Sequence, residues 1–268
     1  MMQTAIQYLY RSSHDGDVLL YAWFVSMHTR VDIVLYSRKT ERELLSVINC
    51  IYDALCRLEK TANFYASDSE LSLLNQRASV APVVLSEELY SMIAVCLEYN
   101  RKTLGCFDVT THSENYNQTT IHCVHLSAKD RSVYFSQQGV VINLSGFLKG
   151  YALDIIRGIL NEAMIKNALI NMGNSSVLAL GNHPAGLGWK INDILLYNEC
   201  LTTSGNDSPC RRHIVSPQDG KLVEGVGQVA VVTDNGAIGE ILSTALFAAN
   251  NGLRKILQGV YSQYRLYI

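Results

Sequence analysis

The sequence has few of the features that separate one domain from another. Only four of its 268 residues are proline, and no proline- or serine-rich linker divides it into halves. We also find no internal repeat of roughly 20 to 50 residues, which excludes a solenoid or a repeat array. Because 48% of the residues are hydrophobic, the chain can bury a large core. We therefore expect one domain over residues 1–268, with one or two lobes.

The sequence also lacks an excess of one charge and a long apolar run. A net charge of −2 gives no support for nucleic acid or an anionic membrane as partner. The longest apolar run, Val18 to Met27, is too short to cross a bilayer. The N-terminus shows neither a signal peptide nor a cysteine for lipid attachment. We therefore expect no membrane insertion and a cytoplasmic location.

The cysteines form no Cys-x-x-Cys pair. An odd, scattered set of this kind indicates reduced thiols, as in a cytosolic protein, without a disulfide framework or a zinc site. The seven positions are Cys50, Cys56, Cys96, Cys106, Cys123, Cys200 and Cys210.

The most informative stretch of the sequence runs from Val140 to Leu160. An apolar run, 140–142, precedes a small-residue segment, 145–150, and then an amphipathic pattern, which predicts a strand, a tight turn and a helix. Main-chain N–H groups at a helix start attract phosphate, and Lys149 adds a full charge beside them. The stretch is suited to binding an anion, but an ordinary turn with an exposed lysine explains it equally well.

Other segments have clear helix or strand patterns. Thr40 to Lys60 is predicted as a helix, since Thr40 and Glu43 form a capping box. A short helix should start between Ser67 and Glu70, and a longer one should span Ser86 to Leu104 with Ser86 as its cap. An apolar helix is expected over 238–248. The predicted strands are two within 17–36, then 121–124, 132–135, 168–172, 189–191, 194–197 and 228–233.

Polar groups gather where predicted elements end. Loops rich in small or hydroxyl-bearing residues are expected at 105–111, 173–176 and 202–205, and His213 precedes a turn that runs from Pro217 to Gly220. Glu240 and Thr244 lie one helical turn apart, so they could supply oxygen ligands to Mg²⁺. Each feature also has a structural explanation, because Asp, Thr and Gly form turns and a threonine can bond back to its own helix.

Taken together and in this order, these segments resemble the ApbE family of FAD:protein FMN transferases, once tied to thiamine biosynthesis. The resemblance runs from about Ser26 to Asn250, and its central segment, Asn143 to Asp154, resembles the family hallmark D-L-G-G-I-A-K-G-Y-A-V-D. The other segments follow the family's order of short motifs. They are 27–29 (Met-Gly-Thr in the family), Tyr65 with 69–75 (S-E-L-S-x-L-N), 107–110 (F-D-P-T), 169–174 (L-V-N-L-G-G), 203–205 (T-S-G), 213–220 (H-I-I-D-P-x-T-G) and 240–245 (D-A-L-S-T-A).

The resemblance implies a fold and a set of binding residues. The fold would be α+β: a single ApbE-like (T-fold-like) domain, with mixed sheets and packed helices around an FAD cleft. The residues implied at the flavin and nucleotide ends are Met27, Tyr65, Asn75, Asp108, Thr110, Thr203, Ser204 and Gly205. Lys149 and Gly150 would serve the diphosphate, with Asp154 nearby. The Mg²⁺ ligands would be the Leu148 carbonyl, Glu240 and Thr244.

The implied reaction fits these residue types. FMN would pass from FAD to a Thr or Ser hydroxyl in a flavinylation segment of an acceptor protein, and AMP would leave. Mg²⁺ and Lys149 can neutralise the diphosphate charge. His213 is the expected general base, because the reference pKa of histidine lies near neutrality.

Several positions depart from the family pattern. Asn143, Ser216 and Glu240 replace aspartates, whereas Ser145 and Asn174 replace glycines. Losing two acids would lower the negative charge of the metal site. Two other readings therefore stay open: a flavin-binding member without transfer activity, and a pyrophosphatase that gives FMN and AMP.

Overall fold

The computed structural model describes residues 6–12, 16–206, 208 and 212–268 of the chain. They fall into two compact units. The first unit comprises Met1–Arg57, Lys149–Thr202 and Val232–Gly239, and the second comprises Leu58–Leu148, Thr203–Val231 and Glu240–Ile268. The prediction of a single domain over 1–268 stays a prediction.

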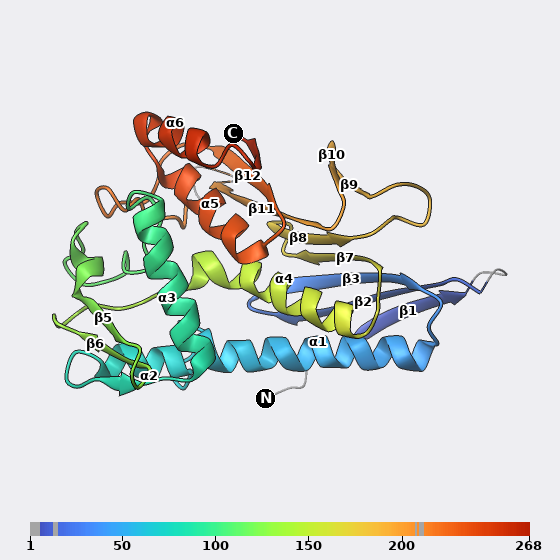
Figure 1. Ribbon diagram of the computed structural model, residues 1–268, viewed down its shortest axis with the longest axis horizontal. Coiled ribbons are helices and arrows are strands. Elements are labelled where there is room, and N and C mark those ends of the chain that lie inside the picture. The colour runs from blue at the N-terminus through green and yellow to red at the C-terminus, as the bar shows by residue number, and fades with distance from the viewer. Residues whose placement is uncertain (1–5, 13–15, 207, 209–211) are drawn as a thin grey trace. The chain divides into compact units, whose positions relative to one another are not determined.

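The first unit contains an antiparallel sheet (Figure 1). Its strand order is β1-β2-β3-β7-β8-β11, and neighbouring strands pair antiparallel. The strands span Gln7–Ser12, Val18–Ser26, Thr29–Ser37, Asn167–Met172, Ser176–Leu180 and Glu199–Asn206. A separate ribbon pairs β9 (Trp189–Ile191) with β10 (Ile194–Leu196).

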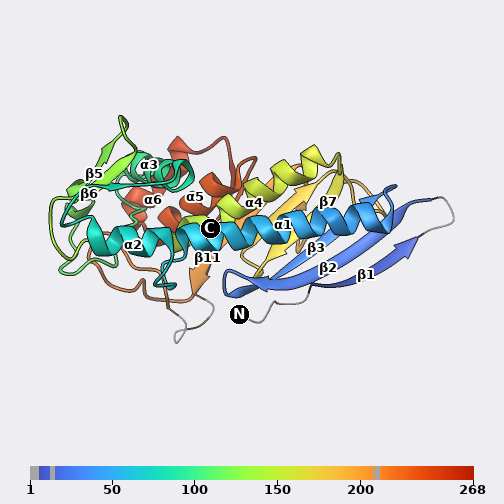
Figure 2. The ribbon, with the colours of Figure 1, turned by 90° about the horizontal axis from the view of Figure 1, so that it is seen from below.

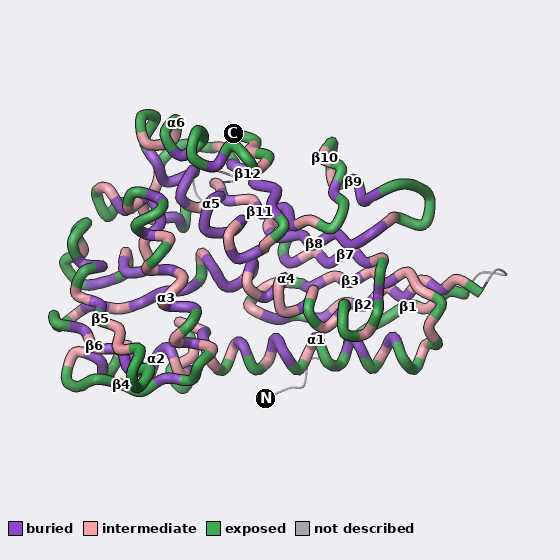
Figure 3. The backbone as a smooth tube through the Cα atoms, in the orientation of Figure 1, coloured by how far each residue is buried: buried purple, intermediate pink, exposed green. Residues whose placement is uncertain are grey.

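Helices cover one face of this sheet. Within the first unit, α1 (Glu41–Ala62) and α4 (Ser145–Glu162) lie along the strands in both Figure 1 and Figure 2. Alternate residues of β2 are buried beneath them, because side chains of a strand point to opposite faces in turn. Buried and exposed stretches alternate along α1 in Figure 3 as its apolar residues recur every three or four positions.

The capping box of α1 is confirmed. The main-chain N–H of Thr40 donates to Glu43 Oε2 at 2.8 Å, and the Glu43 N–H donates to Thr40 Oγ1 at 3.3 Å. Each side chain therefore satisfies a main-chain donor that the start of the helix leaves unpaired.

The second unit is mainly helical. It contains α2 (Glu70–Arg77), α3 (Glu87–Lys102), α6 (Asn251–Val260), the short helix η1 (Thr120–Cys123) and most of α5 (Gly236–Ala248). Ser69 and Ser86 cap α2 and α3, so both predicted helix starts are confirmed. A small sheet has the order β4-β6-β5, and β11, β12 and β13 are neighbours. These strands span Val83–Val84, Ser132–Phe135, Val124–Ser127, Gly227–Thr233 and Arg265–Tyr267.

The predicted strand at 140–142 is wrong, and so is the turn at 145–150. Residues 140–144 are irregular, and α4 begins at Ser145, so the small residues are its first turns. Side chains take the place of a neighbouring strand. The N–H of Val141 donates to Ser113 Oγ at 2.9 Å, and the N–H of Ile142 donates to Asn75 Oδ1 at 2.8 Å.

Two further predictions need correction. Residues 120–123 form η1, and the strand predicted at 121–124 begins only at Val124. Residues 202–205 do not form a turn but lie inside β11, where Thr202 pairs with Ser176 of β8. Hydroxyl side chains are common in turns, but Thr also suits a strand, and the pairing partner decides between the two.

Candidate functional site

Lys149 belongs to the first unit, in the second turn of α4. Its ammonium donates to Ser175 Oγ at 2.6 Å and lies 3.2 Å from Ser176 Oγ. Both serines follow a tight turn in which Gly173 and Asn174 have φ of +63°. The hydroxyl groups therefore hold the lysine charge in a fixed place. The sequence pointed to both segments separately but not to their contact.

Asp154 holds the start of α5. Its two carboxylate oxygens accept the N–H groups of Gly236 and Ala237 at 2.7 and 2.9 Å. Burial raises the pKa of Asp154 above its usual value, and these two hydrogen bonds oppose the rise. A Cβ on Gly236 would lie 2.4 Å from the Gly150 carbonyl oxygen, so the two helices approach closely here. Gly150 and Asp154 thus position the first turn of α5.

Met27 lies in the two-residue turn between β2 and β3. Met27 and His28 have φ of +53° and +58°, the backbone of a type I′ turn. Strand twist favours this turn, but side chains other than Asn, Asp and Gly adopt it at a cost. The family motif has glycine where this chain has His28.

A hydroxyl cluster lies in the second unit between β11 and α5. Ser204 Oγ is 2.8 Å from Ser243 Oγ and 3.1 Å from Thr244 Oγ1. The first turn of α4 is also close, because a Cβ on Gly146 would lie 3.6 Å from Thr244 Oγ1. Three segments singled out in the sequence therefore meet at Thr244. Thr203 and Gly205, on either side of Ser204, also lie in β11. A Cβ on Gly205 would lie 2.3 Å from the Gly227 carbonyl oxygen.

The residues expected to bind Mg²⁺ all belong to the second unit. Glu240 is 3% exposed, and Leu148 and Thr244 are the other two expected ligands. All three offer hard oxygen atoms, which suit Mg²⁺. Leu148 lies inside α4, where a carbonyl ordinarily accepts the N–H four residues on, so only its second lone pair is left for a ligand. Among the described residues, no group of three or more His, Cys, Asp or Glu side chains could hold a metal ion.

Asp108 and Thr110 form a polar network with a residue that the sequence did not single out. Asp108 Oδ1 accepts the N–H and the hydroxyl of Thr110 at 2.7 and 2.6 Å. Asp108 Oδ2 lies 3.0 Å from the hydroxyl of Tyr116, which is also 3.2 Å from the Pro217 carbonyl oxygen. Burial raises the pKa of Asp108, and these hydrogen bonds oppose the rise. Tyr116 thus joins the segment 107–110 to the turn after His213.

Three more residues predicted for the site, Asn75, Tyr65 and His213, differ from one another in their surroundings. The Asn75 side chain donates to the Ile142 carbonyl at 2.9 Å, and thereby fixes the segment that leads into α4. Tyr65 is 68% exposed and meets Phe64 edge to face, so it presents an aromatic ring to solvent. His213 is also exposed, and the turn that follows it is confirmed by the hydrogen bond from Gly220 N to Ser216 O.

The sequence profile of the ApbE family matches residues 27–263, which is most of the chain. The chain belongs to the ApbE family. Among its relatives, the FAD:protein FMN transferase of Chlamydia muridarum is 25% identical over 74% of this chain and 73% of its own. The enzyme of the same name from Treponema pallidum is 23% identical over 80% of this chain and 74% of its own.

Solved structures of ApbE proteins share the fold. The flavin transferase ApbE from Vibrio cholerae matches 98% of this chain and 93% of its own with a TM-score of 0.78 at 17% identity. The ApbE protein from Thermotoga maritima matches 97% of this chain and 93% of its own with a TM-score of 0.76 at 23% identity. The predicted α+β class is confirmed.

Asn143 shows what one departure from the ApbE hallmark does. Its Oδ1 accepts the N–H of Ser145 at 2.9 Å, just where α4 begins. An aspartate could make the same hydrogen bond, so asparagine keeps the structural contact but removes a negative charge.

None of the helices in the described part of the chain has the length and hydropathy needed to span a membrane. The six cysteines within it are free thiols, and Cys210 lies outside the described residues.

Proposed function

We propose that this ApbE protein transfers FMN from FAD to a threonine or serine hydroxyl of an acceptor protein and releases AMP. The observation that carries the proposal is the family match over 27–263, together with relatives named FAD:protein FMN transferase. The chemistry of the retained Lys149, His213 and Thr244 supports it.

In this proposal Lys149 binds the FAD diphosphate. Cleavage of the diphosphate builds negative charge on the leaving AMP phosphate, and a fixed cation stabilises that charge. Two serine hydroxyls already hold the Lys149 ammonium, so it needs little reorganisation when FAD binds. Gly150 follows Lys149 and has no side chain. Asp154 contributes indirectly, because it holds the start of α5.

His213 accepts the proton of the acceptor hydroxyl. An alcohol is a weak nucleophile until it begins to lose its proton, and an imidazole can take that proton near neutral pH. His213 is exposed, as a group that serves a protein acceptor needs to be. The new bond joins the hydroxyl oxygen to the FMN phosphorus, and the bond to the AMP oxygen breaks.

Mg²⁺ binding is a further part of the proposal. The ion would supply positive charge to the diphosphate oxygens. Glu240, Thr244 and the Leu148 carbonyl are the residues that would hold it, with phosphate oxygens completing the ligand set. Met27, Tyr65, Asn75, Asp108, Thr110, Thr203, Ser204 and Gly205 are proposed to line the flavin and nucleotide ends. We further propose a cytoplasmic acceptor.

A flavin-binding protein without transfer activity is the second candidate. Asn143 favours it, because the chain keeps the helix-capping contact at this position but has lost the charge. Ser216, at another acidic position of the family motif, points the same way.

Incubation with FAD tests these candidates. The protein is mixed with FAD, with and without Mg²⁺, beside an acceptor that carries a D-x-x-T-G-A-T-like segment. AMP is followed by chromatography, and the acceptor by mass spectrometry. Mg²⁺-dependent AMP release with FMN on the acceptor supports the transferase. AMP with only free FMN indicates a pyrophosphatase, and bound FAD without AMP indicates the second candidate.

A further inference from the structure

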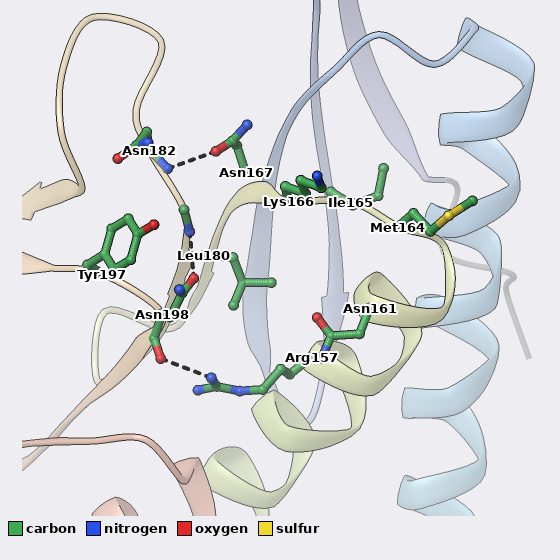
Figure 4. Close-up of a pocket in the computed structure, with 11 residues that line it drawn as sticks. Arg157, Asn161, Met164, Ile165, Lys166, Asn167, Leu180, Asn182, Tyr197 and Asn198 are labelled. Atoms are coloured by element: carbon green, nitrogen blue, oxygen red, sulfur yellow. Dashed lines mark hydrogen bonds between the residues drawn. The ribbon is translucent and has the colours of Figure 1, made fainter.

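A pocket of about 700 Å³ lies in the first unit, beside the first residue of β7 and the last residue of β8. Figure 4 shows Arg157 and Asn161 on α4, and Tyr197 and Asn198 on the segment that faces α4, with the Arg157 side chain extending across to the Asn198 carbonyl. None of the residues expected to bind FAD is among the described residues that line it. Its volume is within the range of small-molecule sites.

The hydrogen bonds around the pocket orient three of its asparagines. Gly181 N donates to Asn198 Oδ1 at 2.8 Å, Asn182 N donates to Asn167 Oδ1 at 2.8 Å, and Gly188 N donates to Asn182 Oδ1 at 3.0 Å. A main-chain N–H can only donate, so in each amide the oxygen is the bonded atom. The other end of each amide is therefore an NH₂ group, which is a donor.

The pocket also carries positive charge. Arg157 donates from its terminal nitrogens to the Asn198 carbonyl at 3.0 Å and to Cys200 Sγ at 3.2 Å. These contacts hold the guanidinium in place, and its Nε is buried without a hydrogen-bond partner among the described residues. Lys166 adds a second cation, and no carboxylate is among the described residues that line the pocket.

A pocket that offers hydrogen-bond donors and two cations but no carboxylate should bind an anion with several acceptor oxygens. We propose that this pocket binds a small molecule that carries a phosphate or carboxylate group. The Tyr197 ring and hydroxyl and the apolar side chain of Leu180 would contact the rest of the molecule. This second site does not depend on the proposed transfer reaction.

Calorimetric titration of the full chain in metal-free buffer tests the proposal. The probes are pyrophosphate, AMP and citrate, with adenosine as the neutral counterpart of AMP. Asn198→Asp keeps the oxygen that accepts the Gly181 N–H but replaces the NH₂ donor with a negative oxygen. Lys166→Glu reverses an exposed charge, and Lys255→Glu makes the same change on the exposed surface of α6. Lys149→Ala separates this pocket from the proposed diphosphate site.

At least one of the three anions should bind, and adenosine should not. Binding should weaken about tenfold or more in Asn198→Asp and Lys166→Glu, because each loses a donor and gains a repelling charge. Lys255→Glu should bind as the unmodified chain does. In Lys149→Ala, which loses the cation of the proposed diphosphate site, the binding that Asn198→Asp and Lys166→Glu weaken should remain. Tighter binding of AMP would identify a phosphate ligand, and tighter binding of citrate would identify a carboxylate ligand. The proposal is overturned if no anion binds at about 10 mM, or if the two pocket variants bind as tightly as Lys255→Glu.

Discussion

At the scale of single residues, Lys149 has the clearest expected role. Replacing it with alanine should weaken FAD binding about tenfold to a hundredfold, because a hydrogen bond to a charged group contributes roughly 1.5–3 kcal/mol. Quenching of flavin fluorescence on titration measures the affinity. Lys255→Ala is the matched control, since Lys255 is an exposed lysine of α6. Equal affinities in the two variants would remove Lys149 from the diphosphate site.

His213→Ala should separate binding from chemistry. We expect FAD affinity to stay within about twofold of the original, whereas FMN transfer should fall about a hundredfold or more, the contribution of a general base. The readouts are the same fluorescence titration and the mass of the acceptor. Normal transfer by this variant would show that another group takes the proton.

Glu240→Gln tests the metal site. The amide keeps the size of the side chain but loses the charge that would attract Mg²⁺, so AMP release should no longer respond to added Mg²⁺. Circular dichroism should first establish that the variant folds, because Glu240 is buried. An unchanged Mg²⁺ response would place the ion elsewhere.

The candidate residues could be read from the sequence, but their contacts could not. Lys149, Asp154 and Thr244 each lie in a recognisable motif. Their partners come from distant parts of the chain: Ser175 lies 26 positions from Lys149, and Gly236 lies 82 positions from Asp154. Tyr116 was missed because a tyrosine in a polar loop has no distinctive spacing, and only the fold brings it to Asp108 and Pro217.

At the scale of elements, the turn between β2 and β3 stores strain at His28. His28→Gly should raise the free energy of unfolding by about 0.5 to 1 kcal/mol, because glycine adopts positive φ without steric cost but is more flexible in the unfolded chain. Urea unfolding with an unchanged slope would measure the gain. The neighbouring Val25→Gly, in a strand, should destabilise the protein. A loss of stability in His28→Gly would mean that the side chain's own contacts outweigh the strain.

The sequence correctly predicted those elements that depend on residues close together in the chain. The capping box of Thr40 and Glu43 and the caps Ser69 and Ser86 depend on residues three apart, so the sequence reveals them. The run 140–142 has a strand composition, but its N–H groups bond to Ser113 and Asn75. Composition cannot show which partner a segment will find.

At the scale of the whole molecule, the backbone passes between the two units five times, within α1, α4, β11, β12 and α5. Because a helix or strand unfolds cooperatively, we expect both units to unfold in one transition. Both tryptophans, Trp23 and Trp189, belong to the first unit, so their fluorescence reports on that unit, whereas circular dichroism reports on the whole chain. The two urea curves should coincide, and separate midpoints would contradict a single domain.

The ratio of AMP to acceptor-bound FMN tests the central claim most directly. With FAD, Mg²⁺ and an excess of acceptor, we predict equal amounts of the two products, with FMN on the threonine or serine of the segment. An acceptor with alanine at that position should yield neither product above background. AMP without bound FMN, or no AMP at all with tightly bound FAD, would contradict the assignment of this chain as an FMN transferase.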